Sequence, residues 1–191
     1  MDIKFKNVDI KISDKYIVKD FNETFIDNKI NLLLGKSGSG KTTILRVLMG
    51  FVEIDKGEIT GFTDKSLSTV FQEDRLIESL SVFKNLNLVT EDKEKIYEAL
   101  KRTEIFDAKN KKVNELSGGM KRRVAIIRAL LKDSDLLIMD EPFVGIDKET
   151  LVKVMGYVKE MSVGKTVIIA THDENVNKYF DKNNLIYVKE N

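Results

Sequence analysis

The sequence contains no cysteine and no long apolar segment. Without cysteine, the chain cannot form a disulfide, a thiolate metal site or a thiol nucleophile, which fits a reducing compartment. No segment approaches the roughly 20 consecutive apolar residues of a membrane-spanning helix. Residues 1–13 alternate apolar and charged positions in part and lack the apolar centre of a signal peptide. We therefore expect that any link between this chain and a membrane comes through a partner protein.

The sequence also lacks an excess of charge of one sign. It holds 32 Lys and Arg against 31 Asp and Glu, a formal net charge of +1. Nucleic-acid-binding proteins usually carry a basic excess or a basic face, so we expect no nucleic-acid partner. The cluster Lys121–Arg123 is a local exception. With 191 residues, of which 42% are hydrophobic, the chain can form one large domain or one domain with an inserted lobe.

The hydrophobic pattern predicts alternating strands and helices. Strands are expected at 3–10, 17–26, 30–34, 58–60, 68–72, 135–140 and 166–171, and helices at 42–50, 120–131 and 148–161. This alternation predicts a mainly parallel α/β sheet, with a small antiparallel β part at the N-terminus. The charged, helical character of 91–106 predicts that about 74–116 forms an inserted α-helical lobe. We expect a single domain, 1–191, whose core is 1–73 and 117–191.

A phosphate-binding loop is predicted where the third strand meets the first helix. Gly35, Gly40, Lys41 and Thr42 satisfy Gly-x4-Gly-Lys-Ser/Thr in the strand–loop–helix context that this motif requires. We expect Lys41 to reach the β- and γ-phosphates and the Thr42 hydroxyl to bind Mg²⁺. The alternative is a flexible turn that happens to contain a lysine. The expected nucleotide contacts are Gly35, Lys36, Ser37, Gly38, Ser39, Gly40, Lys41, Thr42 and Thr43.

Two acids and the single histidine follow later predicted strands. Asp140 and Glu141 end "LLIMDE", and His172 follows "TVIIAT". In an open parallel sheet ligands bind at the carboxyl ends of strands, so Asp140 is a candidate Mg²⁺ ligand. Glu141 would orient the attacking water, and His172 could contact that water or the γ-phosphate. The alternatives are an ordinary strand-to-loop exit and a structural histidine.

The order of these elements, with "LSGGM" at 116–120 between Gln72 and "LLIMDE", resembles the ATP-binding cassette of ABC transporters. The resemblance covers essentially the whole chain and implies a P-loop NTPase fold. In that family two cassettes pack head to tail around two ATP molecules, and each signature caps the nucleotide of the other subunit. The resemblance therefore implies that Ser117, Gly118 and Gly119 act in trans. Taken alone, the Ser-Gly-Gly could instead be a helix-capping turn.

The same resemblance assigns roles to further residues. Gln72 resembles the glutamine that touches magnesium and water and joins the core to the lobe. Glu141 resembles the catalytic base, and His172 the switch histidine. Asp147 resembles the aspartate whose loop crosses the dimer interface. The implied cofactors are ATP and Mg²⁺, and the implied activity is ATP hydrolysis, with Lys41, Glu141 and His172 as catalytic residues.

Some positions depart from the family pattern. Ile12 stands where the family usually has an aromatic residue stacked on adenine, and the nearest aromatic, Tyr16, is expected within a strand. Met120 and Lys121 replace a more common polar pair. The residues of "VFQEDRL" and "LSGGM" are most similar to those of sulfonate-, nitrate- and taurine-type importer cassettes. The chain ends soon after His172, so we expect no separate C-terminal regulatory domain.

The resemblance implies that the chain is the ATPase subunit of a transporter, and two alternatives stay open. The expected partners are a second cassette, identical or paralogous, and separate membrane permease subunits, with the chain cytoplasmic and peripheral on the inner face of the membrane. A chain without a fused span favours import. The alternatives are a soluble, non-transport ABC ATPase and a nucleotide-sensing module. Candidate docking residues for the permease are Leu80, Val82, Phe83 and Leu86, which could instead pack inside the lobe.

Overall fold

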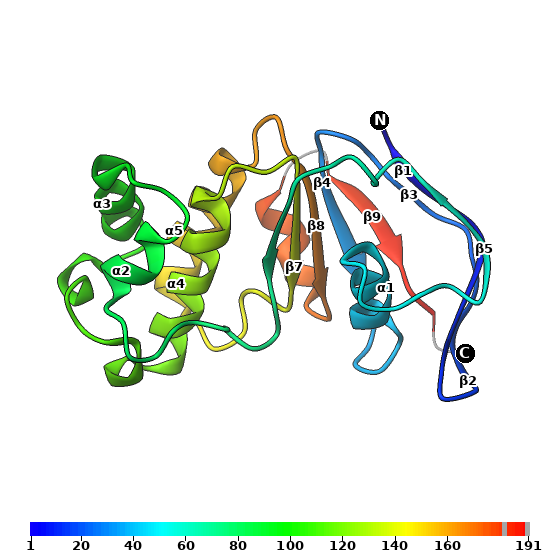
Figure 1. Cartoon of the computed structure of the whole chain (residues 1–191), viewed down its shortest axis with the longest axis horizontal. Helices are drawn as coiled ribbons and strands as arrows, with labels where there is room; N and C mark the ends of the chain where they lie inside the picture. Colours follow the sequence, from blue (N-terminus) through cyan, green and yellow to red (C-terminus); the bar gives the residue numbers. More distant parts are fainter. Residues whose placement is uncertain (181–182, 190–191) are drawn as a thin grey trace.

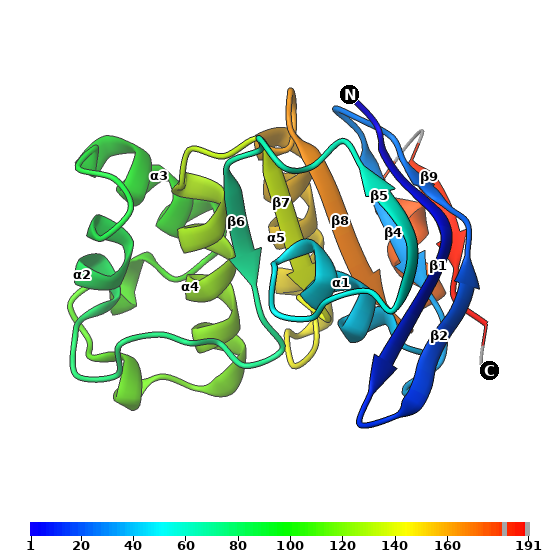
Figure 2. The same ribbon diagram turned by 45° about the vertical axis from the view of Figure 1, so that its right-hand side comes forward.

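A computed structural model describes residues 1–180 and 183–189 of the chain. Two sheets and a group of helices lie side by side in Figures 1 and 2. The strands are β1 (Ile3–Ile12), β2 (Lys15–Phe21), β3 (Thr24–Phe25), β4 (Ile30–Leu34), β5 (Lys56–Thr60), β6 (Leu67–Val70), β7 (Leu136–Asp140), β8 (Thr166–Thr171) and β9 (Asn184–Tyr187). The helices are α1 (Lys41–Leu48), α2 (Val82–Asn87), α3 (Lys93–Arg102), α4 (Gly118–Leu131) and α5 (Lys148–Met161).

The larger sheet is parallel and has the strand order β6-β7-β8-β4-β9. β7 and β8 are buried at every position, as expected for apolar strands covered on both faces by helices or a second sheet. Because β7, β8 and β4 are neighbours and parallel, the residues that follow them meet at one edge of the sheet. The predicted phosphate loop, Glu141 and His172 follow these three strands.

Each face of the parallel sheet packs against its own apolar cluster. On one face α1 lies between the parallel sheet and the antiparallel sheet that β1 forms with β2, β3 and β5. On the other face α4 and α5 pack on the sheet, and the helices of the 74–116 segment pack on α4 (Figure 2). The mainly parallel sheet with a small antiparallel part is confirmed. The division into core and lobe stays a prediction, because Ile96 of α3 belongs to the same apolar cluster as Val154 of α5.

Several boundaries differ from those expected. The strand expected at 17–26 divides into β2 and β3 at residues 22–23, where the Asn22 side chain accepts a hydrogen bond from the backbone N–H of Asn7 and donates one to the carbonyl oxygen of Asp20. β6 ends at Val70, so Gln72 lies in the loop beyond it. The helix expected at 120–131 begins two residues earlier, at Gly118.

The structure buries two of the four candidate docking residues, and Leu80 and Phe83 are partly exposed. Val82 and Leu86 are fully buried in the apolar cluster beneath α4, which favours packing inside the lobe. Phe83 is partly buried against the same cluster, where its ring lies 5.7 Å from that of Tyr97. None of the helices in the described part of the chain is long and apolar enough to cross a membrane.

Candidate functional site

The loop from Gly35 to Gly40 connects β4 to α1, as the motif predicts. Gly40 stands at the N-terminal cap of α1 with a φ of 100°, a conformation that side-chain-bearing residues rarely adopt. A Cβ atom at this position would lie 2.7 Å from Cγ2 of Val18, so the loop approaches β2 too closely for any other residue. The first turn of α1 holds no acidic residue. Its free N–H groups therefore offer an uncompensated positive site for an anion.

Lys41 is buried within this loop. Its side chain folds back, and Nζ donates hydrogen bonds to the carbonyl oxygens of Gly35 at 2.7 Å and Lys36 at 2.9 Å. The ammonium is thus held over the loop by neutral acceptors. Phosphate oxygens are stronger, charged acceptors, so a bound phosphate would be favoured at this ammonium.

Thr42 and Asp140 form the part of the site that suits a metal ion. Asp140 ends β7 and is 5% exposed. Its burial raises its pKa, and the hydrogen bond from the Thr42 side chain opposes this rise. Its Oδ1 atom is buried without a hydrogen-bond partner. A hydroxyl beside a buried carboxylate oxygen fits Mg²⁺, which is usually held by one or two protein groups together with substrate phosphates. Across residues 1–180 and 183–189, no cluster of three or more His, Asp or Glu side chains could hold a metal alone.

The carboxylate of Glu141 is held by the end of the neighbouring strand β8. The hydroxyl of Thr171 donates to Oε2 at 3.0 Å, and the backbone N–H of His172 donates to Oε1 at 3.1 Å. The imidazole Nδ1 of His172 lies 2.8 Å from the same Oε1. Glu141 has a φ of 45°, so the backbone is locally strained where it leaves β7. These contacts fix a carboxylate at the sheet edge, beside the phosphate loop.

Gln72 joins this site from the loop after β6. A pocket of about 180 Å³ is lined by Ile17, Ser37, Gly38, Gly40, Lys41, Thr42, Thr43, Gln72 and Glu141. Six of the nine predicted loop residues therefore surround one cavity together with Gln72 and Glu141. A second, smaller pocket brings Gln72 together with Thr42 and Asp140.

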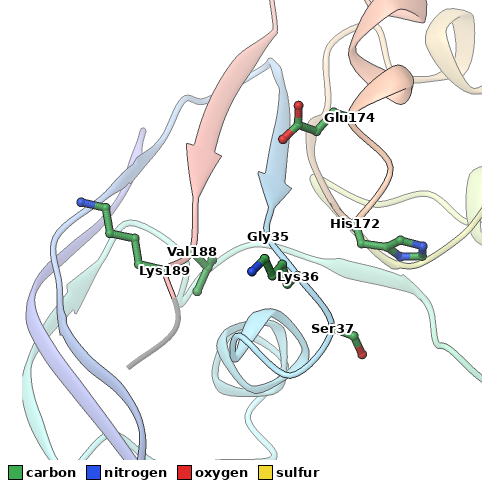
Figure 3. A pocket seen from close by; sticks show the side chains of 7 residues that line it. All are labelled: Gly35, Lys36, Ser37, His172, Glu174, Val188 and Lys189. Carbon is green, nitrogen blue, oxygen red and sulfur yellow. The ribbon is translucent and has the colours of Figure 1, made fainter.

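A larger pocket of about 520 Å³ adjoins the start of the loop (Figure 3). It is lined by Gly35, Lys36, Ser37, His172, Glu174, Val188 and Lys189. His172 and Ser37 thus face a hollow that is open to solvent. Glu174, Val188 and Lys189 were not predicted, because they follow short or irregular elements that carry no motif.

The Ser-Gly-Gly segment and Asp147 occupy a different place from the phosphate loop. The Ser117 hydroxyl accepts a hydrogen bond from the backbone N–H of Met120 and so caps α4, which is the local role that the alternative interpretation predicts. Asp147 caps α5 by accepting from Thr150 N–H at 3.0 Å. A Cβ atom on Gly119 would lie 2.6 Å from the carbonyl oxygen of Gly145, so the two segments pack closely together. Neither segment lines the three pockets around the phosphate loop.

The position expected to contact a nucleobase is aliphatic. Ile12 is 40% exposed at the end of β1, where it pairs with Lys15 of β2. Ile17, which the sequence did not single out, lines the pocket at the phosphate loop, and Ile12 does not. Tyr16 lies within β2 as expected, and its ring contacts the ammonium groups of Lys11 at 4.4 Å and Lys19 at 4.6 Å.

Comparison with known proteins places these features in a family. A family model described as "ABC transporter" matches residues 18–144. The chain is 34% identical over 192 residues to the spermidine/putrescine import ATP-binding protein PotA of Clostridium novyi, covering 90% of this chain and 55% of PotA. It is 36% identical over 160 residues to the thiamine import ATP-binding protein ThiQ of Jannaschia sp., covering 74% of this chain and 70% of ThiQ. The chain therefore spans about half the length of PotA.

A solved structure shares the fold over almost the whole chain. The dimeric ATP-binding cassette MJ0796, in a post-hydrolysis state with ADP and Pi bound, superimposes with a TM-score of 0.82 at 29% identity. The match covers 98% of this chain and 94% of that one. The similarity therefore extends beyond the residues matched by the family model.

Proposed function

Because the chain belongs to the ABC transporter family, we propose that it binds and hydrolyses ATP as one of two cassettes that drive separate membrane subunits. The observation that carries this proposal is that Lys41, in the loop-to-helix turn after β4, meets Asp140 and Glu141, at the end of β7, at one edge of the parallel sheet, where β8 separates the two strands. A phosphate-binding lysine, a magnesium-binding acid and a residue that orients water are the groups that phosphate-loop ATPases use.

Binding of ATP would begin at the loop. Phosphate oxygens replace the carbonyl oxygens of Gly35 and Lys36 as acceptors for Lys41, while the N–H groups at the start of α1 donate to the same phosphates. Thr42, Gln72 and Asp140 are the residues that would hold Mg²⁺, which neutralises charge on the transferring phosphoryl group when it is bound. The buried, unpartnered Oδ1 of Asp140 supports this assignment.

Hydrolysis requires a water molecule in line with the γ-phosphate. Glu141 would orient and polarise this water, while Thr171 and His172 hold the carboxylate in a single place. A pre-positioned carboxylate lowers the entropic cost of reaching the transition state. His172 would therefore act on the reaction through Glu141.

The second cassette would complete each site. Ser117, Gly118 and Gly119 form a helix N-terminus with exposed N–H groups, which is a second anion cradle remote from the chain's own phosphate loop. We infer that this cradle and Asp147 serve the nucleotide of the partner subunit. The dimeric state of the MJ0796 cassette supports this arrangement.

The membrane partner is proposed from the relatives. PotA and ThiQ are both named as import ATP-binding proteins, so we propose an importer with separate permease subunits and a chain peripheral on the cytoplasmic face of the membrane. The resemblance to sulfonate-, nitrate- and taurine-type cassettes stays a prediction.

The decisive experiment measures the solution mass of Glu141→Gln with and without Mg-ATP. This change keeps the side chain in place but removes the charge that polarises water, so ATP should bind without being hydrolysed. We expect a shift from monomer to dimer with Mg-ATP and none with Mg-ADP. The double variant Lys41→Ala, Glu141→Gln is the control and should stay monomeric. A monomer at saturating Mg-ATP would contradict the trans role of the signature in the isolated subunit.

A further inference from the structure

The basic cluster after the Ser-Gly-Gly segment makes contacts that the proposed function does not use. Arg122 of α4 reaches the loop that carries Gln72: Nη1 donates to the carbonyl oxygen of Phe71 at 2.7 Å, and Nη2 donates to the carbonyl oxygen of Gln72. Its Nε lies 3.2 Å from Oδ1 of Asp74, an ion-pair contact without hydrogen-bond alignment. One guanidinium thus holds three residues of this loop.

This contact is buried. Arg122 is 8% exposed, and the Asp74 side chain is 22% exposed. Burial raises the pKa of Asp74, while the charge of Arg122 opposes that rise. Arg128, six residues further along α4, donates to the carbonyl oxygen of Arg75 at 2.9 Å. Side chains of α4, and not a neighbouring strand, therefore donate the hydrogen bonds that the backbone carbonyl oxygens of this loop accept.

The loop needs such a support because it leaves the sheet before Gln72. β6 ends at Val70, and the chain then passes along α4 to reach α2 (Figure 2). Gln72 is exposed and lines two pockets of the nucleotide site. Where its side chain starts is set by its main chain, which Arg122 holds.

We propose that Arg122 is a positioning residue that ties the main chain of Gln72 to the signature helix. Through this tie, Gln72 in the chain's own nucleotide site and Ser117 at the start of α4 move as one unit. The inference rests on the proposed function, and it assigns to Arg122 the mechanical link between the two composite sites. A planar guanidinium suits this task because its fork reaches several carbonyl oxygens at once, whereas a lysine offers a single point of charge.

The test is a double-mutant cycle that joins Arg122→Gln with Gln72→Ala. The measurements are the kcat for ATP hydrolysis, the Mg²⁺ concentration at half-maximal rate, the affinity for ATP without Mg²⁺ and the Tm. We expect Arg122→Gln to lower kcat by about 10- to 100-fold and to raise the Mg²⁺ requirement, because loss of an outer support typically has effects of this size. ATP affinity without Mg²⁺ should stay within about twofold, since Arg122 makes no contact with the phosphate loop.

The double variant separates positioning from general destabilisation. If Arg122 acts through Gln72, then Arg122→Gln should have little further effect on kcat once Gln72→Ala is present. Additive losses would overturn the proposal. Arg122→Lys should recover only part of the activity. Lys121→Gln is the matched control on the same helix, because Lys121 pairs with the exposed Glu78 at 3.0 Å and should leave kcat within about twofold of wild type.

Two further outcomes keep the inference distinct from the proposed function. Should Arg122→Gln show no cooperative melting, Arg122→Lys replaces it in the cycle, because this change keeps a buried positive charge beside Asp74 and removes the fork that reaches the carbonyl oxygens of Phe71 and Gln72. A folded variant of either kind that matches Lys121→Gln in kcat and Mg²⁺ requirement would overturn the inference. An inactive wild-type chain would contradict the proposed function instead.

Discussion

The imidazole Nδ1 of His172 lies 2.8 Å from Oε1 of Glu141, and the His172 backbone N–H donates to the same oxygen at 3.1 Å. Two groups of one residue thus meet one carboxylate oxygen, while Thr171 binds the other oxygen at 3.0 Å. The end of β8 therefore sets the direction of the carboxylate that follows β7.

Removal of the His172 side chain should separate its catalytic role from stability. We expect His172→Ala to lower kcat for ATP hydrolysis by roughly 100-fold, because Glu141 loses one of its three holding contacts. The His172 side chain is 58% exposed, so the free energy of unfolding should change by less than about 0.5 kcal/mol. Steady-state hydrolysis and urea denaturation provide the two measurements. Glu174→Gln, on the rim of the adjoining pocket, is the control; an equal loss of kcat in both variants would contradict the role of His172.

Lys41→Ala should abolish tight binding of ATP. The ammonium is buried in the loop where we propose that the phosphates bind, so its loss should weaken ATP affinity by at least about 30-fold. Equilibrium titration with ATP measures this change. Lys56→Ala removes an exposed cation from β5 and should leave the affinity unaltered. Unchanged affinity in Lys41→Ala would refute the assignment of the phosphate loop.

The sequence predicted the long buried strands better than it predicted the short elements of the fold. β7 and β8 are continuous apolar runs that end in acids or in His172, so both their burial and their chemistry can be identified from the residues. β9 and α2 escaped prediction because they are only 4 and 6 residues long, and their pairing depends on β4 and α4. Nothing in the sequence distinguishes Arg122 from a surface cation until the fold brings the Phe71 carbonyl within 2.7 Å.

The close packing of Gly119 on Gly145 predicts opposite effects for two glycine substitutions. In Gly119→Ala the new Cβ meets a backbone carbonyl oxygen at 2.6 Å, so the Asp147 loop or α4 must shift, at a cost of about 1–3 kcal/mol. Gly156 lies in the middle of α5 with open space around its Cβ position, and Gly156→Ala should stabilise the fold by about 0.5–1 kcal/mol. Urea denaturation of both variants tests this. Equal stabilities would show that the Gly119 contact carries no constraint.

Asp27 should make stability depend on pH in the acid range. Nζ of Lys65 donates to its carboxylate at 2.6 Å and the Thr166 hydroxyl at 2.7 Å, and these bonds hold the pKa of Asp27 well below its ordinary value. A carboxylate with a depressed folded-state pKa stabilises the fold above its unfolded-state pKa of about 3.9 and loses this contribution as the pH falls further.

We therefore expect the free energy of unfolding to fall below about pH 4 more steeply in the wild type than in Asp27→Asn. Urea denaturation between neutral pH and about pH 2 follows both proteins. Asp64→Asn, at an exposed position beside Lys65, should retain the wild-type slope. Parallel curves for Asp27→Asn and the wild type would show that the Lys65 and Thr166 bonds do not control the acid sensitivity.

Ile12 predicts weak discrimination between nucleobases. An aliphatic side chain packs against any base but cannot supply the stacking energy of an aromatic ring, which is about 1–3 kcal/mol per base. Ile12→Tyr should therefore raise the affinity for ATP by roughly tenfold. Competition between ATP and GTP measures the accompanying change in preference, which we expect to be small in the wild type. Ile26→Tyr is the matched control, since Ile26 is also 40% exposed but lies beyond β3. An equal gain in both variants would indicate nonspecific binding of the base and not a platform at position 12.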